Sequence, residues 1–144
     1  MKCLNAAIAL EPSNPKVHER TVQFRHVVGP ELASLDKTTA EVLKSEFPSL
    51  TEGTDALKKF NDEYLERNKA DPRAVHAGVR ARRMLAPAEG LECEKRLVGL
   101  VGAEGMELRD AVEVLRTLEG WKSGGVEVFK ERAGERWAEA SAFE

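Results

Sequence analysis

Apolar residues recur every three or four positions along this chain of 144 residues. This spacing places them on one side of an α-helix. The clearest case is Leu57, Phe60, Tyr64 and Leu65, which stand at i, i+3, i+7 and i+8. No alternating pattern typical of a strand competes with it. The pattern therefore predicts an all-α fold of about eight helices of ordinary length.

The other predicted helices have stripes of the same kind. Their inward-facing positions are, in chain order, Ala6, Ala7, Ile8 and Leu10; Val17, Thr21, Phe24 and Val28; Leu35, Thr39, Val42, Leu43 and Phe47; Ala74, Ala77, Ala81, Met84 and Leu85; Cys93, Leu97, Leu100 and Val101; Leu108, Ala111, Val112, Leu115 and Leu118; and Val126, Phe129, Ala133, Trp137 and Ala140.

A very short connection separates the predicted helix that contains Leu57 and Leu65 from the one that contains Ala74 and Leu85. Asp71 is a good N-cap residue, and Pro72 at the first helical position loses only an N–H that would have had no partner. Helices joined this closely lie nearly antiparallel, which is the unit of an α-solenoid. The sequence therefore predicts antiparallel helix pairs in a single domain that covers residues 1–144.

Other boundaries follow from caps and helix-breaking residues. We expect Gly29 and Pro30 to end the second helix. Thr38 and Glu41 have the spacing of a capping box at the start of the third, and Thr54 is placed to cap the fourth.

Composition narrows the class of protein. The chain is 42% hydrophobic and 33% charged with a net charge of −3. These values are typical of a globular helical domain and argue against a dedicated nucleic-acid domain. Two cysteines, no signal peptide and no bilayer-length apolar run indicate a reduced, cytosolic chain. Both ends interrupt helical patterns, so we expect a C-terminal fragment of a longer α-solenoid protein.

Candidate catalytic residues are few. His18, His26 and His76 do not have the i, i+4 spacing of a helical metal site. The glycines near position 102 follow no strand and precede no Lys-Ser or Lys-Thr, so a helix end explains them better than a phosphate loop. Cys3 and Cys93 lie on apolar faces, where cysteine usually packs as a small hydrophobic residue. We therefore expect no enzyme activity, cofactor or metal.

The predicted helix at 108–118 carries more apolar surface than one layer of helices needs. Two interpretations stay open: a groove for a partner helix, or a core face covered by the last helix with Phe129 and Trp137. The candidate partner-binding residues are Leu97, Leu100, Val101, Leu108, Val112, Leu115, Leu118 and Trp121.

A basic patch offers a second surface. Arg73, Arg80 and Arg83 share one side of their predicted helix and could meet a phosphate backbone such as ribosomal RNA. The alternative is a solvated face balanced by Glu63 and Glu66 on the neighbouring helix, and charge runs of this kind are more often solvated.

Several segments carry a resemblance to known proteins. An Ala-rich helix that ends in Leu85-Ala86-Pro87 resembles the second helix of a tetratricopeptide repeat, although the Trp, Gly and Tyr positions of the first helix are missing. The order of features resembles the C-terminal region of the auxiliary subunit of the NatA N-terminal acetyltransferase. The matching segments are Leu10-Glu11-Pro12-Ser13-Asn14-Pro15, the run from Phe60 to Asn68 with the following Pro72 helix, Leu85-Ala86-Pro87, Ala111–Leu118 and Ala142-Phe143.

This resemblance implies a role. In that family the auxiliary subunit wraps the catalytic subunit and anchors the complex at the ribosome in the cytoplasm. Its C-terminal part holds the regulator Huntingtin-interacting protein K through a small ubiquitin-associated-type domain. The expectation is a non-catalytic docking platform for that regulator, with no membrane contact. The catalytic acetyltransferase subunit would bind through the rest of the chain.

Two other functions remain as alternatives. One is a stand-alone tetratricopeptide adaptor that binds an extended peptide, for which Asn5 and Asn61 are the candidate asparagines. The other is a basic RNA or ribosome-contact module centred on Arg80 and Arg83. Salt separates them, because phosphate binding weakens steeply with ionic strength and apolar docking does not.

Overall fold

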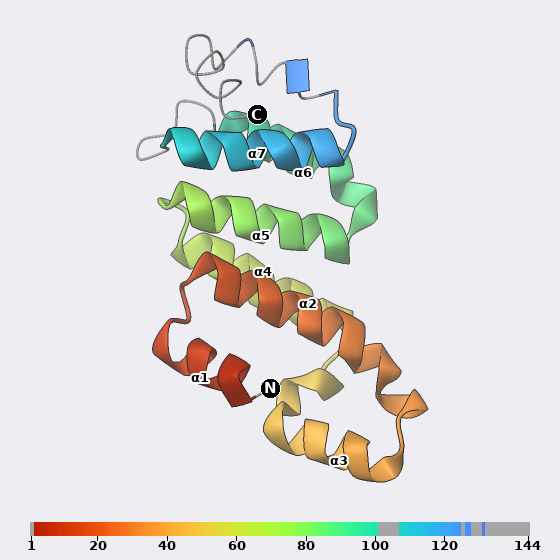
Figure 1. The fold of residues 1–144 in the computed structure, drawn as a ribbon. Helices are drawn as coiled ribbons and strands as arrows, with labels where there is room; N and C mark the ends of the chain where they lie inside the picture. Colours follow the sequence, from red (N-terminus) through yellow and green to blue (C-terminus); the bar gives the residue numbers. More distant parts are fainter. Residues whose placement is uncertain (1, 101–106, 125, 128–130, 132–144) are drawn as a thin grey trace.

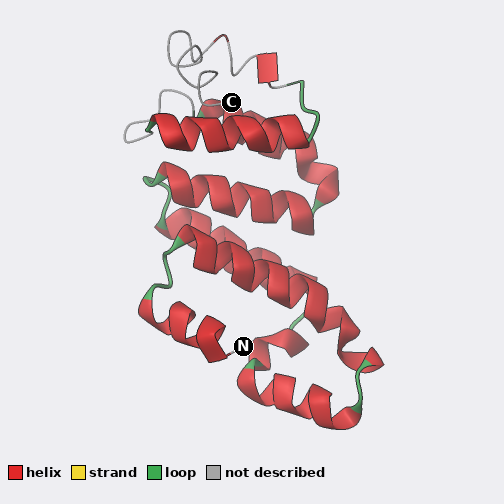
Figure 2. Cartoon of the chain, viewed as in Figure 1, coloured by secondary structure: helices red, strands yellow, loops and turns green. Residues whose placement is uncertain are grey.

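The computed structural model describes residues 2–100, 107–124, 126–127 and 131, and the predicted all-α fold is confirmed for them: they contain helices and turns but no strand (Figures 1 and 2). The described residues contain seven α-helices: α1 (Lys2–Leu10), α2 (Pro15–Glu31), α3 (Lys37–Glu46), α4 (Thr54–Arg67), α5 (Pro72–Leu85), α6 (Gly90–Gly99) and α7 (Leu108–Gly120). Three short 3-10 turns, Leu32–Ser34, Pro48–Thr51 and Pro87–Glu89, join some of them. The eighth predicted helix, with Phe129 and Trp137, falls outside the described residues except at a few positions.

The predicted start of α5 is confirmed. Asp71 is the N-cap, and its Oδ1 accepts a hydrogen bond of 3.0 Å from the amide of Arg73. Pro72 takes the first helical position. At α2, Asn14 has the same role and accepts from the amides of Lys16 and Val17. A side-chain oxygen thus satisfies the exposed amides of each first turn.

The predicted end of α2 is wrong. The helix continues through Gly29 and Pro30 to Glu31. Proline in a last turn costs one hydrogen bond but keeps a helical φ. The continuation also lets Val28 and Leu32 pack on the cluster that contains Phe47.

Two predicted caps are also wrong. Helix α3 is capped by Asp36, whose Oδ2 accepts from the amide of Thr39 at 3.0 Å, and not by Thr38. A carboxylate at this position competes well with a hydroxyl two residues later. Thr54 is the first residue inside α4, and the cap position is held by Gly53, which offers no side chain.

The helices lie in two rows. Helices α2, α5 and α7 follow one another with their N-terminal ends on the same side, and α4 and α6 lie behind them and run the opposite way (Figure 1). Helix α5 is central because it contacts α2, α4, α6 and α7. None of the helices in the described part of the chain is long and apolar enough to cross a membrane.

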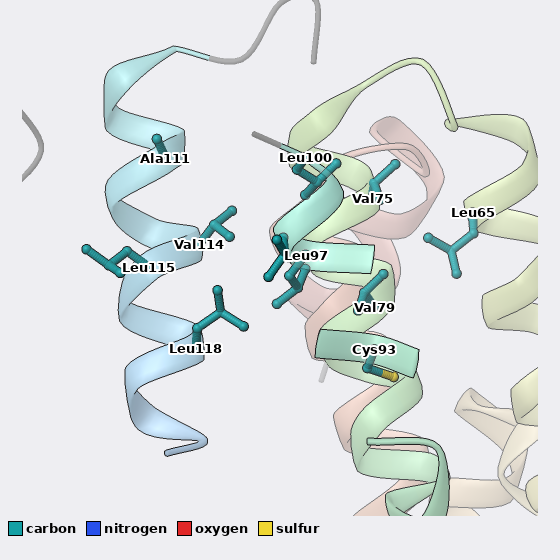
Figure 3. Packing of buried hydrophobic residues seen from close by; sticks show 11 residues of the cluster. Leu65, Val75, Val79, Cys93, Leu97, Leu100, Ala111, Val114, Leu115 and Leu118 are labelled. Carbon is teal, nitrogen blue, oxygen red and sulfur yellow. The ribbon is translucent and has the colours of Figure 1, made fainter. Parts of the chain in front are cut away.

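The largest core cluster joins α4, α5, α6 and α7, and its side chains are shown in Figure 3. It consists of Leu65, Val75, Val79, Cys93, Leu97, Val98, Leu100, Ala111, Val114, Leu115 and Leu118. Two smaller clusters complete the core of the described residues, one around Val22 and Leu57 and one around Leu43 and Phe47. Dispersion and apolar burial in these clusters provide the main favourable term for folding.

Helices α4 and α5 approach closely at one point. A Cβ atom added to Gly78 would lie 2.6 Å from Cγ of Leu65. The small residues Ala74, Ala77 and Ala81 are buried on the same helix, as the pattern predicted. Glycine and alanine therefore allow the two backbones to come together.

Candidate functional site

The predicted partner stripe is placed in the core. Leu97, Leu115 and Leu118 have no exposed surface, and Leu100 and Val112 are also buried. Figure 3 shows Val114 and Leu118 of α7 directed toward α6, and Leu115 belongs to the same core cluster. The expectation of an open apolar groove along this stripe is therefore wrong for these five residues, because α7 packs on two neighbouring helices.

The remaining stripe residues differ. Leu108 and Trp121 are partly exposed, and Val101 lies outside the described residues. The guanidinium of Arg83 lies over the Trp121 ring, with Cζ 4.4 Å from its centroid. Arg83 thus belongs to the contact between the C-terminal ends of α5 and α7, where a cation over an indole face is favourable.

The two other arginines of the predicted basic face are neutralised by acids. Arg73 Nε lies 3.0 Å from Oδ1 of Asp110. Arg80 Nε lies 3.2 Å from Oε1 of Glu19. The balancing acids come from α7 and α2, so the expectation that Glu63 and Glu66 would balance this face is wrong. Glu66 instead pairs at 2.8 Å with Lys69, in the turn that follows α4.

A groove of about 650 Å³ crosses α5 between α2 and α7. His76 and Ala77 on α5 are among the residues that line it. The charged residues of its lining are Lys16, Arg73, Arg80 and Arg109, which are basic, and Glu19, Asp110 and Glu113, which are acidic. No local pattern in the sequence predicts this groove, because its walls come from helices more than 50 positions apart that only the tertiary structure brings together.

His76 fixes the position of α7 over the groove. Its Nε2 lies 2.8 Å from Oγ1 of Thr117, and that hydroxyl donates to the carbonyl of Glu113 at 3.0 Å. His76 is therefore the donor in its own bond. Burial, with a smaller contribution from the positive charge of Arg80, lowers the pKa of His76 to about 4, so the ring is neutral at pH 7.

The pKa of Glu19, the acid that pairs with Arg80, is also shifted. Burial raises the pKa of the Glu19 carboxyl, and the positive charges of Arg80 and Arg20 oppose this increase. Lys16 and Arg109, on the two walls, form no ion pair with any residue in the described part of the chain. These two cations are thus available to a ligand in the groove.

A second polar cluster is fully enclosed between α2, α4 and α5. Asn61 Nδ2 donates to the carbonyl of Gly78 at 2.9 Å, and its Oδ1 lies 2.7 Å from Nε2 of His18. The His18 ring stacks on Tyr64 with centroids 3.6 Å apart, and Tyr64 donates to the carbonyl of Ser13 at 3.0 Å. Asn61 has no exposed surface. It therefore cannot contact a peptide, as the adaptor interpretation required.

Burial also sets the protonation states of this cluster. It lowers the pKa of His18 and raises that of Tyr64 to about 12. Both rings are neutral near pH 7, so the cluster acts as a hydrogen-bonded spacer between helices and not as an acid–base pair. Asn5, the other candidate asparagine, donates to the carbonyl of Glu46 at 3.1 Å.

The described residues offer little support for a nucleophilic cysteine or a metal site. The Cys93 thiol is buried, and desolvation raises its pKa above the ordinary value, which disfavours the reactive thiolate. Within the part of the chain that the structure describes, no three His, Cys, Asp or Glu side chains are grouped closely enough to hold a metal ion.

These features define an all-helical protein with a groove of mixed charge across three helices. Comparisons of the chain with models of protein families, with curated proteins and with solved structures find no match.

Proposed function

We propose that this chain is a non-catalytic scaffold that binds a protein partner in the groove over α5. The single observation that carries this proposal is the groove itself, whose walls hold the cations Lys16 and Arg109 without ion pairs in the described structure. Charged groups on an open groove favour recognition of a complementary surface. Such a role needs no catalytic group.

The arrangement of helices supports an α-solenoid as the finer description of the fold. Helices α4 and α5 are joined by a short connection and run in opposite directions, and α6 and α7 also run in opposite directions (Figure 1). Stacked antiparallel pairs of this kind are the units of tetratricopeptide-like proteins. They offer extended surfaces on which partner proteins bind.

The resemblance to the NatA auxiliary subunit supplies the finer function. The run from Phe60 to Asn68 carries this resemblance, and it provides Asn61 and Tyr64 of the buried polar cluster. We therefore propose a C-terminal scaffold segment of that subunit in a cytoplasmic, ribosome-associated complex. Its partner would be Huntingtin-interacting protein K, and the catalytic subunit would bind elsewhere on the longer protein.

The burial of the leucine stripe changes where such a partner would bind. Leu115 and Leu118 are occupied by contacts within the molecule. The groove over α5 is open and lined by residues of both charges. A small helical domain with a mixed-charge face would fit it, with α2 and α7 on either side.

Charge reversal in the groove tests this proposal. The double variant Lys16→Glu, Arg109→Glu should weaken binding of purified Huntingtin-interacting protein K by roughly tenfold or more, because like charges then face each other. Isothermal titration calorimetry measures the Kd. Lys59→Glu on exposed α4 surface is the control. Absence of binding to the unmodified chain, or equal binding by both variants, would contradict the proposal.

A stand-alone adaptor for an extended peptide is the second candidate, and the same groove favours it. The kind of ligand that binds distinguishes this adaptor function from the scaffold function. A short linear peptide from the partner should retain most of the affinity if the groove holds an extended segment, and should lose it if a folded domain is required.

The RNA-contact function has weaker support. The ion pairs of Arg73 and Arg80 reduce the net charge available to phosphates. Binding of single-stranded RNA that fell steeply as salt was raised would favour this alternative.

A further inference from the structure

A second pocket, of about 430 Å³, lies between α2, α3 and the N-terminus of α4, and it has no role in the proposed function. Its cationic lining residues are Arg25 on α2 and Lys44 on α3. The Arg25 side chain is only 8% exposed. A buried guanidinium in a pocket wall is costly unless oxyanions surround it.

The compensation of Arg25 is incomplete. Its Nη2 lies 3.1 Å from Oε2 of Glu52, and its Cζ lies 5.0 Å from the centre of the Phe60 ring. The buried Nε has no hydrogen-bond partner in the described structure. Desolvation lowers the pKa of Arg25 despite the attraction of Glu52, which shows that one carboxylate does not fully offset the burial.

The start of α4 adds further donors to the same pocket. Gly53 is the cap residue, and no side chain bonds to the amides of the first turn. Gly53 and Thr54 both line the pocket. The exposed amides and the positive end of the helix dipole favour an anion there. Asp55, in the first turn, is the acid that already benefits from this end.

We propose that this pocket binds a phosphate-type oxyanion through Arg25, Lys44 and the free amides at the start of α4. The ligand is a phosphate group, either as the free ion or on a phosphorylated peptide. Its tetrahedral oxygens can accept from a guanidinium and from backbone amides at the same time. A nearby ammonium group such as that of Lys44 adds charge attraction without a strict geometry.

Glu52 is the internal competitor for this site. Its side chain is 56% exposed, so it can turn away from Arg25 into water at small cost. While it is in place, its carboxylate occupies the Nη2 donor that a phosphate oxygen would use. Removal of the Glu52 charge therefore strengthens phosphate binding, whereas most substitutions at a binding site weaken it.

The test is a titration with sodium phosphate, followed by amide chemical shifts in NMR spectra at constant ionic strength. The shifts should saturate at residues 53–55. Glu52→Gln should bind phosphate roughly two- to fivefold more tightly, the range set by one exposed ion pair. Lys44→Ala should bind more weakly by a similar factor. Lys59→Ala, on exposed α4 surface, should match the unmodified chain.

Several results would overturn the proposal. One is that the chemical shifts at residues 53–55 do not saturate with phosphate. Another is that Glu52→Gln binds phosphate no more tightly than the unmodified chain. The third is that Lys44→Ala and Lys59→Ala lose the same amount of phosphate affinity. Exposed positions are used because Arg25 is buried and its removal could unfold the chain. A phosphoserine peptide that binds more tightly than free phosphate would identify a protein source, and equal affinities would identify the free ion.

Discussion

Helix α5 is held by two contacts of different kinds. Against α2 and α4, its enclosed polar contacts are neutral hydrogen bonds, in which Asn61 links the Gly78 carbonyl to His18. A partly exposed ion pair between Arg80 and Glu19 lies outside this enclosed cluster. Against α7, α5 uses charged or titratable groups at the edge of an apolar core, in which Arg73 meets Asp110 and His76 meets Thr117.

The difference concerns water. An enclosed hydrogen bond is insensitive to salt, but the loss of one partner leaves a polar group that water cannot reach. An ion pair at the margin is weakened by salt and contributes little by itself. The first contact therefore fixes geometry, and the second can adapt to a ligand in the adjoining groove.

The largest expected effect is on the apolar core under the α5–α7 contact. Leu118→Ala should reduce the free energy of unfolding by about 2–5 kcal/mol, because the side chain has no exposed surface. Urea denaturation followed by circular dichroism measures it. Leu108→Ala, at a partly exposed position, should cost less. If Leu118→Ala weakened partner binding and left stability unchanged, the stripe would be a binding surface after all.

The next effect is on the enclosed contact. Asn61→Ala should cost about 1–3 kcal/mol of unfolding free energy, because the Gly78 carbonyl loses its side-chain donor and the buried His18 ring loses its partner. Asn68→Ala removes a local bond to the Tyr64 carbonyl near the surface and should cost less. Equal costs for the two variants would show that enclosure adds nothing to the bond.

The third effect is a pH dependence of the α5–α7 contact. The pKa of His76 is about 4 in the folded chain and near 6.5 when unfolded, so between these values the unfolded state binds more protons. The contribution of neutral His76 to the free energy of unfolding is fully present above pH 6.5. It is lost as the pH falls toward 4, by at most about 1.4 kcal/mol per pH unit.

His76→Gln isolates this dependence, since it keeps a donor for Thr117 and removes the titration. Urea denaturation of both proteins at several pH values between 7 and 4 provides the comparison. The stability difference between them should shift in favour of the variant as the pH falls. Parallel pH profiles would show that His76 is solvated in the folded state.

The smallest effect is on the marginal ion pair. A double-mutant cycle with Arg73→Ala and Asp110→Ala should give a coupling free energy of about 0.2–1 kcal/mol that decreases with added salt. The side chain of Arg73 is 53% exposed. A coupling that salt did not change would place this pair with the enclosed contacts.

The sequence predicted the helices well because each apolar stripe is a local signal. The cap at Asp71 and the small residues of α5 could also be predicted, since each depends on its near neighbours in the chain. The end of α2 was missed because packing of Val28 and Leu32 outweighs the cost of Pro30.

The surfaces could not be predicted in the same way. The wide apolar stripe on α7 is covered by α5 and α6. A stripe covered by a partner protein would have the same sequence pattern. The ion pairs of Arg73 and Arg80 depend on acids about 40 and 60 positions away, which no local pattern connects. Charge neutralisation and grooves are therefore properties of the assembled helices.

The central position of α5 also limits how its sequence can change over time. This helix contacts α2, α4, α6 and α7, so little of its circumference is free of neighbours. Leu65 leaves no space for a larger side chain at Gly78. Eight residues of α5 are buried. In a scan of all single substitutions, we expect α5 to accept the fewest changes. Helix α3, with eight of its ten residues outside the core, should be the most variable during evolution.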